Sequence, residues 1–260
     1  MNLWILRLTL VMLFLFLPSP KTQASTESGW VLEQKSKISG QHQIFISANR
    51  IKAVNNLSKI SMFMQAPAWK IVILNDLSKT YYLTDIKNFG GENSGRVFAA
   101  HRDENSQGRW FYKGKSTVLN QKVDILYLSR QHVTGPQTRP GSVFEVANMT
   151  GVANATTWCM TDTKLSKPMA EFVSRIYCVS NKLHEFPVRV IYMDSEGATT
   201  LSLQTKSIKP MTITDSLFVI PKSYKQVKSE DLVYNDEQSK NSLKESFDWL
   251  GDVDKTKTKH

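Results

Sequence analysis

Residues 61–83 read SMFMQAPAWKIVILNDLSKTYYL and predict three successive β-strands. The apolar runs at 61–65, 69–74 and 80–83 are short, and turn-forming residues separate them. The residues at 75–79 suit a hairpin connection. The run at 69–74 is rich in β-branched residues and lacks clean alternation with polar ones, which favours a strand covered on both faces. This pattern predicts an antiparallel meander.

Comparable runs continue on both sides of this stretch. The further strands that they predict lie at 30–38, 43–47, 51–54, 110–112, 122–128, 142–147, 156–160, 186–193, 198–207, 211–213 and 217–220. Residues 168–179 predict a helix, because Ser166 can cap it, Pro168 suits the first turn, and apolar residues recur at helical spacing. The predicted fold class is therefore mainly β with α (α+β).

The first 24 residues have the three parts of a secretory signal peptide. Arg7 supplies a positive charge, residues 8–17 form an unbroken apolar run, and Thr22 and Ala24 are small residues before the cut. A membrane-spanning helix needs roughly 20 apolar residues, so a cleaved signal is favoured over the alternative, a signal anchor. We expect cleavage after Ala24 and a periplasmic or secreted protein with no transmembrane segment in the mature chain.

The remaining chain is expected to form one domain at 25–227 with a charged tail. Residues 87–108 are rich in glycine and polar residues, and we interpret them as an insertion that forms a long loop or a lid. The composition shifts to charged and amide residues near the end, so 228–260 is expected to be flexible or loosely docked.

The chain is basic, with a formal charge of +10 that becomes +8 once Arg7 and Lys21 leave with the signal. A basic exported protein can bind anionic lipid head groups, acidic polysaccharide or acidic proteins, although the charge can also serve solubility alone. The lysines and arginines are dispersed and no RNA-binding motif is visible, so nucleic acid is not an expected partner.

Cys159 and Cys178 are the two cysteines of the chain. In an oxidising compartment an isolated pair predicts one disulfide, and the spacing lacks the C-x-x-C form of a redox pair. The five histidines are scattered, and none has the spacing of a metal ligand set, so no metal or cofactor is expected. No G-x-S-x-G, H-E-x-x-H or P-loop motif is present, which favours a binding protein over an enzyme.

Three phrases resemble the periplasmic outer-membrane lipoprotein carriers (lipoprotein localisation factor-like proteins) and their uncharacterised relatives. They are ISANRIK at 46–52, KIVILNDLSKTYY at 70–82 and LFVIPKSY at 217–224. The resemblance spans about 30–227. It implies a curved antiparallel sheet that forms an unclosed half-barrel, with helices on its concave side and an apolar cavity for acyl chains. The insertion, the cysteine pair and the tail are not part of the family pattern.

The resemblance also implies a set of ligand-binding residues. Arg50 or Lys52 matches the basic residue that gates the cavity or orients the head group, and the alternative for both is an ordinary surface charge. Trp110 and Tyr112 could line the cavity mouth, and the apolar residues could equally be plain core. The residues assigned to the apolar cavity are Phe45, Met62, Met64, Trp69, Ile71, Ile73, Tyr81, Trp110 and Tyr112.

Three functions compete at this stage. The leading hypothesis is an exported carrier that binds a lipid acyl chain or a lipidated protein, with outer-membrane lipoprotein sorting as one form of it. The alternative is an envelope interaction or sensor protein without a cavity ligand, which uses its basic surface or tail to bind envelope proteins. An envelope hydrolase is the least favoured.

Overall fold

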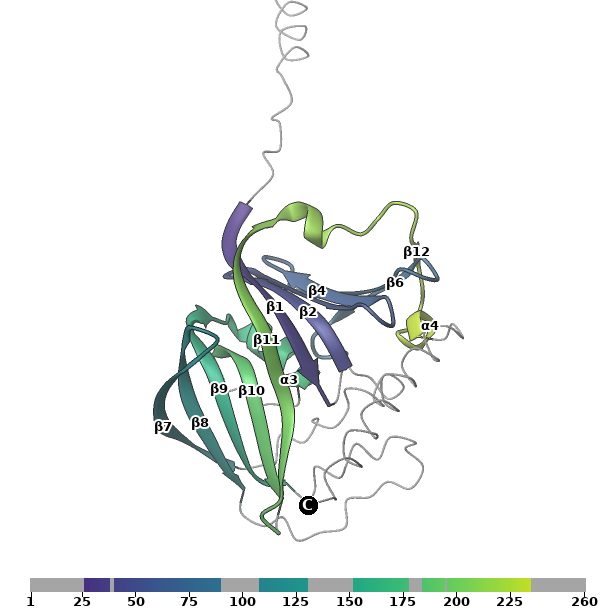
Figure 1. The fold of residues 1–260 in the computed structure, drawn as a ribbon. Helices are drawn as coiled ribbons and strands as arrows, with labels where there is room; N and C mark the ends of the chain where they lie inside the picture. Colours follow the sequence, from purple (N-terminus) through teal and green to yellow (C-terminus); the bar gives the residue numbers. More distant parts are fainter. Residues whose placement is uncertain are drawn as a thin grey trace, which may run out of the picture.

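The computed structural model describes residues 26–37, 40–89, 108–130, 152–177, 184–194 and 196–234 (Figure 1). Within these residues the strands form a 12-stranded sheet in the order β12-β6-β5-β4-β3-β2-β1-β11-β10-β9-β8-β7. The strands are β1 (Thr26–Ser36), β2 (Gly40–Ser47), β3 (Arg50–Asn55), β4 (Ile60–Gln65), β5 (Lys70–Asn75), β6 (Thr80–Asp85), β7 (Gly108–Val118), β8 (Gln121–Arg130), β9 (Val152–Lys164), β10 (Glu185–Asp194), β11 (Thr199–Thr214) and β12 (Lys225–Gln226).

The sheet has two limbs joined by the antiparallel pairing of β1 with β11. We call β2–β6 with β12 the N-terminal limb and β7–β11 the C-terminal limb. Neighbouring strands are antiparallel except β12, which runs parallel to β6. The order is linear, so β12 and β7 are end strands among the described residues and the sheet is not closed. The mainly β class predicted from the sequence is confirmed, and the sheet is consistent with a half-barrel.

Gly29 lies where the two limbs meet on β1. A Cβ atom at this position would stand 2.2 Å from the carbonyl oxygen of Ile46 on β2 and 2.7 Å from Cγ1 of Ile213 on β11. Because both distances are far below van der Waals contact, the close approach of the three strands requires glycine here.

The meander predicted from residues 61–83 is present as β4, β5 and β6. The turns before β4 and β6 repeat one local device, in which an asparagine side chain accepts hydrogen bonds from the backbone. Asn55 Oδ1 accepts from the amide of Leu57 at 3.0 Å, and Asn75 Oδ1 accepts from the amide of Leu77 at 2.9 Å. Each turn then places a lysine, Lys59 or Lys79, at positive φ. Such side-chain-capped turns fix the hairpin register.

Two predictions near the end of the sheet differ from the structure. Residues 198–207 and 211–213 belong to one continuous strand, β11, which passes through Pro210 opposite Trp30 of β1. Residues 217–220 are not a strand, because the chain turns through a 3₁₀ helix, η3 (Asp215–Phe218). The carbonyl of Leu217 accepts a hydrogen bond from Lys52 Nζ at 2.9 Å. The lysine side chain thus satisfies a backbone carbonyl that a neighbouring strand would otherwise bind. The predicted strand at 142–147 lies outside the described residues.

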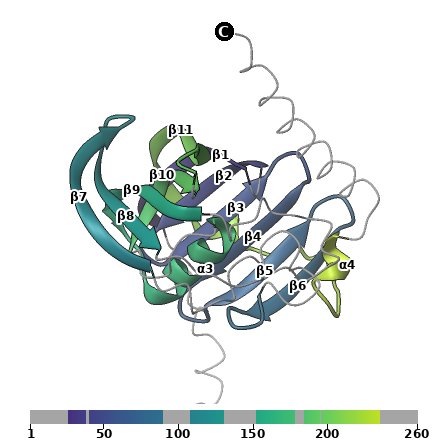
Figure 2. The ribbon, with the colours of Figure 1, turned by 90° about the horizontal axis from the view of Figure 1, so that it is seen from below.

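Helix α3 (Lys167–Tyr177) confirms the helix predicted at 168–179 within the described residues. Its buried side includes Met169, Phe172, Val173 and Ile176, at the spacing of one helical face. In Figure 2 it lies between β8–β9 and β3–β4. None of the helices in the described segments is long and apolar enough to cross a membrane.

Residues 215–224, here called the strap, cross the N-terminal limb and lead to β12 at the edge of the sheet (Figure 1). The chain then forms α4 (Asp231–Tyr234), where the carbonyl of Val233 accepts a hydrogen bond from Asn75 Nδ2 at 2.7 Å. The beginning of the expected tail is therefore docked through Tyr234, and Val233 is fully buried. Residues 235–260 and the predicted signal peptide at 1–24 lie outside the described residues.

Candidate functional site

The N-terminal limb is apolar on both of its faces. Met62 and Met64 of β4 belong to the main core, whereas Phe63 between them belongs to a second cluster with Phe218 of the strap. Successive side chains of a strand point to opposite faces, so the two clusters lie on opposite sides of the sheet. We call the side of the main core the main face and the side covered by the strap the strap face.

The apolar residues predicted to share one cavity are divided between these faces. The main face holds Met62, Met64, Trp69, Ile71 and Ile73. Phe45 and Tyr81 lie on the strap face instead. The residues predicted on β4 and β5 all lie on the main face, and the two misplaced residues belong to β2 and β6. Phe45 and Tyr81 are apolar on the second face because the strap covers it, and that cover comes from the other end of the domain.

The two aromatic residues predicted for the cavity mouth lie on β7. Tyr112 is 58% exposed. Trp110 pairs with Leu128 in the backbone ladder, and its side chain lies outside the described part of the structure. Tyr112 pairs with Leu126, which packs on the main core. Tyr112 therefore shares the side of the main face but stands at its margin.

Helix α3 covers the main face together with Phe89, which lies near the start of the predicted insertion at 87–108. Phe89 is fully buried against Phe172 of α3, with their ring centroids 5.7 Å apart. The guanidinium of Arg175 donates to the carbonyl of Phe89, which fixes this residue to the helix. The cover thus joins the start of the segment interpreted as a lid to the helix.

A buried polar cluster fastens the last residue of α3 to the sheet. The Tyr177 hydroxyl donates to Oε1 of Gln34 at 2.5 Å and lies 2.9 Å from Nε2 of His42. Gln34 Nε2 donates to the Thr205 hydroxyl at 2.8 Å and to the carbonyl of Pro187 at 3.1 Å. One side chain of the helix is thereby bonded to β1 and β2, and through Gln34 to β10 and β11. We call Gln34, His42, Tyr177 and Thr205 the polar pin.

The environment of the polar pin keeps its members neutral. Burial lowers the pKa of His42 to about 4, although a hydrogen bond with the backbone of Gly40 acts in the opposite direction. Burial raises the pKa of Tyr177 well above its ordinary value. A neutral, hydrogen-bonded cluster can remain in an apolar core at little cost, whereas a charge there would be strongly unfavourable.

The polar pin was not predicted from the sequence. Gln34 and His42 are opposite each other in the β1–β2 ladder, on the same side as the buried residues Leu32 and Ile44. The alternation of the two strands could have indicated the cluster, because a polar residue at an inward position of a strand needs a hydrogen-bond partner in the core. The partner, Tyr177, lies 143 residues from Gln34 and could not be identified locally.

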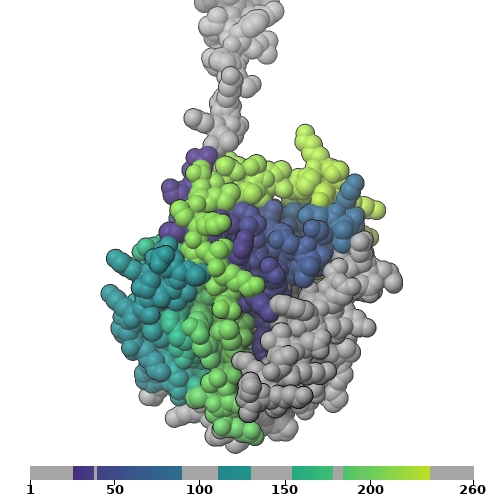
Figure 3. All heavy atoms as spheres, in the orientation of Figure 1, coloured from purple at the N-terminus to yellow at the C-terminus, as the bar shows by residue number. Residues whose placement is uncertain are grey.

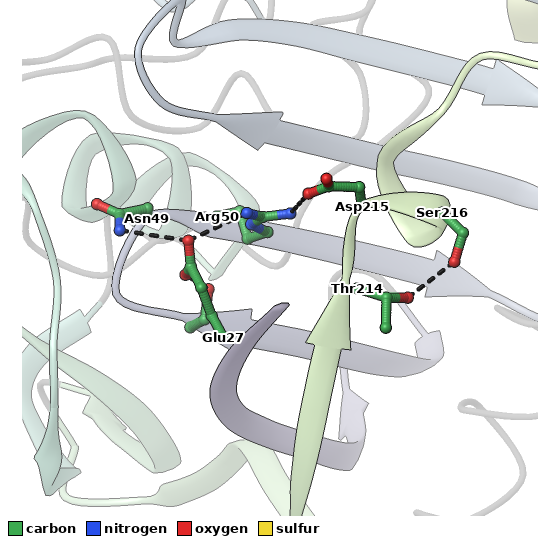
Figure 4. A network of polar contacts seen from close by, with 7 residues as sticks. Glu27, Asn49, Arg50, Thr214, Asp215 and Ser216 are labelled. Atoms are coloured by element: carbon green, nitrogen blue, oxygen red, sulfur yellow. Dashed lines mark hydrogen bonds and ion pairs between the residues drawn. The ribbon is translucent and has the colours of Figure 1, made fainter. Parts of the chain in front are cut away.

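Arg50 ties the strap to the sheet (Figure 4). Its guanidinium donates to Glu27 Oε1 at 3.0 Å and to Asp215 Oδ1 at 2.5 Å, and it lies over the ring of Phe218 at 5.4 Å. Ser47 and Asn49 also donate to the carboxylate of Glu27. Burial alone would raise the pKa of Glu27, but these hydrogen bonds outweigh it and hold that pKa below its ordinary value.

Lys52 lies beside Arg50 on the strap face. Its ammonium group donates to the carbonyl of Leu217 and lies over the ring of Phe63 at 5.8 Å. Burial lowers the pKa of Lys52, with Asp76 acting in the opposite direction. Arg50 and Lys52 therefore both bind η3 from the strap face of the sheet. They are on the opposite side of the sheet from the main face, where the resemblance had implied a gate for the cavity.

The predicted disulfide is not supported. Cys159 is a free, fully buried thiol whose pKa is raised by burial and by the nearby carboxylates Glu185 and Asp124. Cys178 lies outside the described residues. Among the described residues, no group of three histidine, cysteine, aspartate or glutamate side chains is placed to hold a metal ion.

Comparison with known proteins gives structural matches. No family model and no curated protein matches the chain. An uncharacterized conserved protein from Thermus thermophilus matches over 77% of this chain and 90% of that chain, with 11% identity and a TM-score of 0.42. The Pseudomonas aeruginosa MucA/MucB complex matches over 79% of this chain and 59% of that chain, with 9% identity and a TM-score of 0.35.

A LolA-superfamily protein from Nitrosomonas europaea is also similar, over 76% of this chain and 91% of that chain, with 13% identity and a TM-score of 0.25. The solved structures that resemble this chain therefore include a member of the lipoprotein-carrier family that the sequence resembles.

Proposed function

We propose that the protein is an exported carrier that binds the acyl chain of a lipid or of a lipidated protein on its main face. One observation carries the proposal: the main face draws apolar residues from both limbs, and the short helix α3 covers it. We place α3 on the concave side of the sheet, where it fills the space that an acyl chain would occupy. Binding then requires that α3 move away from the sheet.

The composition of the main face supports an adaptable site. Met62 and Met64 of β4 meet Met160 of β9 and Met169 of α3 in the same buried cluster. Methionine is unbranched and polarisable, so it repacks around ligands of different shape more readily than branched residues do. Four methionines within the one buried cluster that includes both the sheet and α3 suit a face that alternates between helix and ligand.

The energies of the two states are comparable. Each methylene group that leaves water gains about 0.8 kcal/mol, so a chain of about ten methylenes gains on the order of 8 kcal/mol before ordering costs. Displacing α3 exposes its five large buried side chains, which together contribute about 8–15 kcal/mol at roughly 1.5–3 kcal/mol each: Met169, Phe172, Val173, Ile176 and Tyr177. A chain of about ten methylenes matches the lower end of this range, so longer acyl chains are the expected ligands and a small polar ligand cannot displace the helix.

The polar pin provides the test. Tyr177→Phe keeps the ring and removes the hydroxyl that bonds Gln34 and His42, so α3 should open more easily. Apparent affinity rises in proportion to the binding-competent population, and a weakening of about 1–2 kcal/mol corresponds to roughly five- to thirtyfold tighter binding of a fluorescent fatty acid. Tyr224→Phe is the matched control, since it removes a tyrosine hydroxyl bond to Asp76 on the strap side.

Two measurements decide the outcome. Native mass spectrometry of the purified protein should detect co-purifying lipid, and the probe should be displaced by unlabelled fatty acid. If delipidated protein binds no acyl probe in either the wild type or the Tyr177→Phe variant, the main face is a permanently filled core and the proposal fails.

Export is part of the proposal and has its own test. Cleavage after Ala24 would leave Ser25 at the new N-terminus, immediately before β1. The intact mass of the protein isolated from its native host should correspond to residues 25–260. A mass that retains the first 24 residues would show a signal anchor or an uncleaved chain.

We propose binding without chemistry as the function of the main face. Among the described residues, the Cys159 thiol and the His42 imidazole are buried and neutral, because burial raises the pKa of the thiol and lowers the pKa of the imidazole. A thiol acts as a nucleophile in its thiolate form, which this environment disfavours. Turnover of an ester or thioester probe that is abolished by Cys159→Ala or His42→Gln would contradict this.

A further inference from the structure

The C-terminal limb presents a face opposite to the main face that the proposed function does not use. Val188, Val190 and Tyr192 of β10 are buried in the main core, so Arg189 and Ile191, which alternate with them, point to the other side. Strands of this limb are uncovered towards the viewer in Figure 3, where they are coloured teal and green. We call this side of β7–β11 the outer face.

Cross-strand pairing arranges the outer face in two rows. The first row crosses all five strands and consists of Phe111, Tyr127, Thr156, Ile191 and Leu201. The second row contains Ile125, Trp158, Arg189 and Gln204 and continues to Lys35 on β1. Trp158 is partly buried and also packs against the main core, so Arg189 and Gln204 are the exposed part of this row. Phe111 is 49% exposed and Leu201 is 39% exposed, so both ends of the first row remain in contact with solvent.

Basic residues lie within and beside these rows. Lys113 holds its ammonium over the ring of Tyr127 at 4.5 Å, and Arg189 holds its guanidinium over Trp158 at 5.0 Å. The pKa of Lys35 is lowered mainly by burial and also by the nearby positive charge of Lys206. The carboxylates close to these rows in sequence include Glu33, two residues before Lys35, and Asp124, which directly precedes Ile125. Like charges are nevertheless held together on one apolar surface.

We propose that the outer face is a docking surface for the anionic head groups of a lipid bilayer. Half-exposed aromatic and aliphatic side chains sit favourably at the level of the head groups, where one end of the side chain is apolar and the other is wet. Lysine and arginine beside them attract anionic lipids, each contributing roughly fivefold in affinity near the surface. The face therefore combines the two contributions that hold peripheral proteins on anionic membranes.

The test is co-sedimentation of the full chain with vesicles made of equal parts phosphatidylglycerol and phosphatidylcholine, against vesicles of phosphatidylcholine alone. Lys113→Glu with Arg189→Glu changes four charges and should weaken binding to the anionic vesicles by at least about a hundredfold. Lys79→Glu with Lys222→Glu makes the same change on exposed lysines of the N-terminal limb and strap, and should retain more of the binding. Binding of the wild type should also fall as salt is raised.

A second pair of variants tests the apolar row. Phe111→Ser with Leu201→Ser should reduce vesicle binding and leave its salt dependence in place, whereas Leu57→Ser with Leu77→Ser, two exposed leucines in turns of the other limb, should not. All of these side chains face solvent, so thermal unfolding should confirm that each variant is folded.

Three results would overturn the proposal: equal binding to neutral and anionic vesicles, a folded Lys113→Glu/Arg189→Glu variant that binds like the wild type, or binding of soluble polyglutamate with no binding of vesicles. The last result would assign the face to an acidic protein. The fatty-acid probe is measured in parallel, because the proposed acyl site is on the other side of the sheet and should be unaffected in these variants. Failure here is thereby distinguished from failure of the proposed function.

Discussion

The strap and helix α3 both cover the sheet, but they are held by different forces. The strap is fixed by an ionic clamp, in which Arg50 joins Glu27 of β1 to Asp215 of η3. Helix α3 is fixed by packing and by the neutral polar pin around Tyr177. The strap is held by charges and is anchored in the sheet at β12, so it suits a permanent cover. Helix α3 is held by apolar contacts and two neutral hydrogen bonds, so an apolar ligand can replace it.

The largest effect is expected from truncating the packing of α3. Phe172 is fully buried, so Phe172→Ala should lower the free energy of unfolding by about 3–5 kcal/mol. Urea denaturation measures this loss. An acyl ligand that fills the vacated space should restore part of it, and Phe218→Ala on the strap face should show no such restoration. Equal rescue of both variants would remove the distinction between the two covers.

The ionic clamp is the next largest contribution. Arg50→Ala leaves Glu27 without its cation and should cost about 1–3 kcal/mol, because Arg50 is buried but the carboxylates of Glu27 and Asp215 are partly exposed and solvent screens the charges that remain. Urea denaturation again measures the loss, and limited proteolysis should show earlier cleavage within 215–224. A variant as stable as the wild type, with an unchanged cleavage pattern, would mean that the clamp does not hold the strap.

The two covers should also respond to acid at different pH. The pKa of His42 is about 4 in the folded protein and near its ordinary value of 6.5 when unfolded, so the unfolded state binds more protons between these values. The stabilisation from neutral His42 is complete above about pH 6.5 and is lost as the pH falls towards 4, by up to about 3 kcal/mol. Glu27, whose pKa is lowered, begins to lose its contribution only below the ordinary value of 4.5.

Equilibrium unfolding measured between pH 7 and pH 4 checks this order. In His42→Gln the slope over that window should be flatter than in the wild type, while the Arg50→Ala variant should keep the wild-type slope. A wild-type slope in the His42→Gln variant would assign the acid sensitivity to other groups.

The smallest effect is expected from an ion pair that belongs to neither cover. Lys70 and Asp85 are 2.5 Å apart on β5 and β6, but both side chains are about half exposed. Solvent screens such pairs, so Lys70→Ala should change the free energy of unfolding by less than about 1 kcal/mol. A loss as large as that of Arg50→Ala would show that burial is not what makes the clamp strong.

The parts of the fold that depend on neighbouring residues were predictable from the sequence. The meander at 61–83 and helix α3 each have their own periodicity and turn or cap residues, and both are present. The assignment of faces failed on β2 and β6, where Phe45 and Tyr81 lie under the strap, because the segment that covers them comes from the other end of the domain and leaves no local signal. The role of Arg50 was missed for a similar reason. Its partners lie 23 and 165 residues away, and only the sheet topology brings them together.

The pairing of β1 with β11 has a consequence for how the chain is made. Strand β1 is complete at Ser36, but its second neighbour ends at Thr214. At a synthesis rate of about 5–20 residues per second, one side of β1 waits roughly 10 to 35 seconds for its partner. Strands β1 and β11 cannot pair until nearly all residues of the domain have left the ribosome. Such distant pairing slows folding and leaves a bare strand edge exposed to self-association in the meantime.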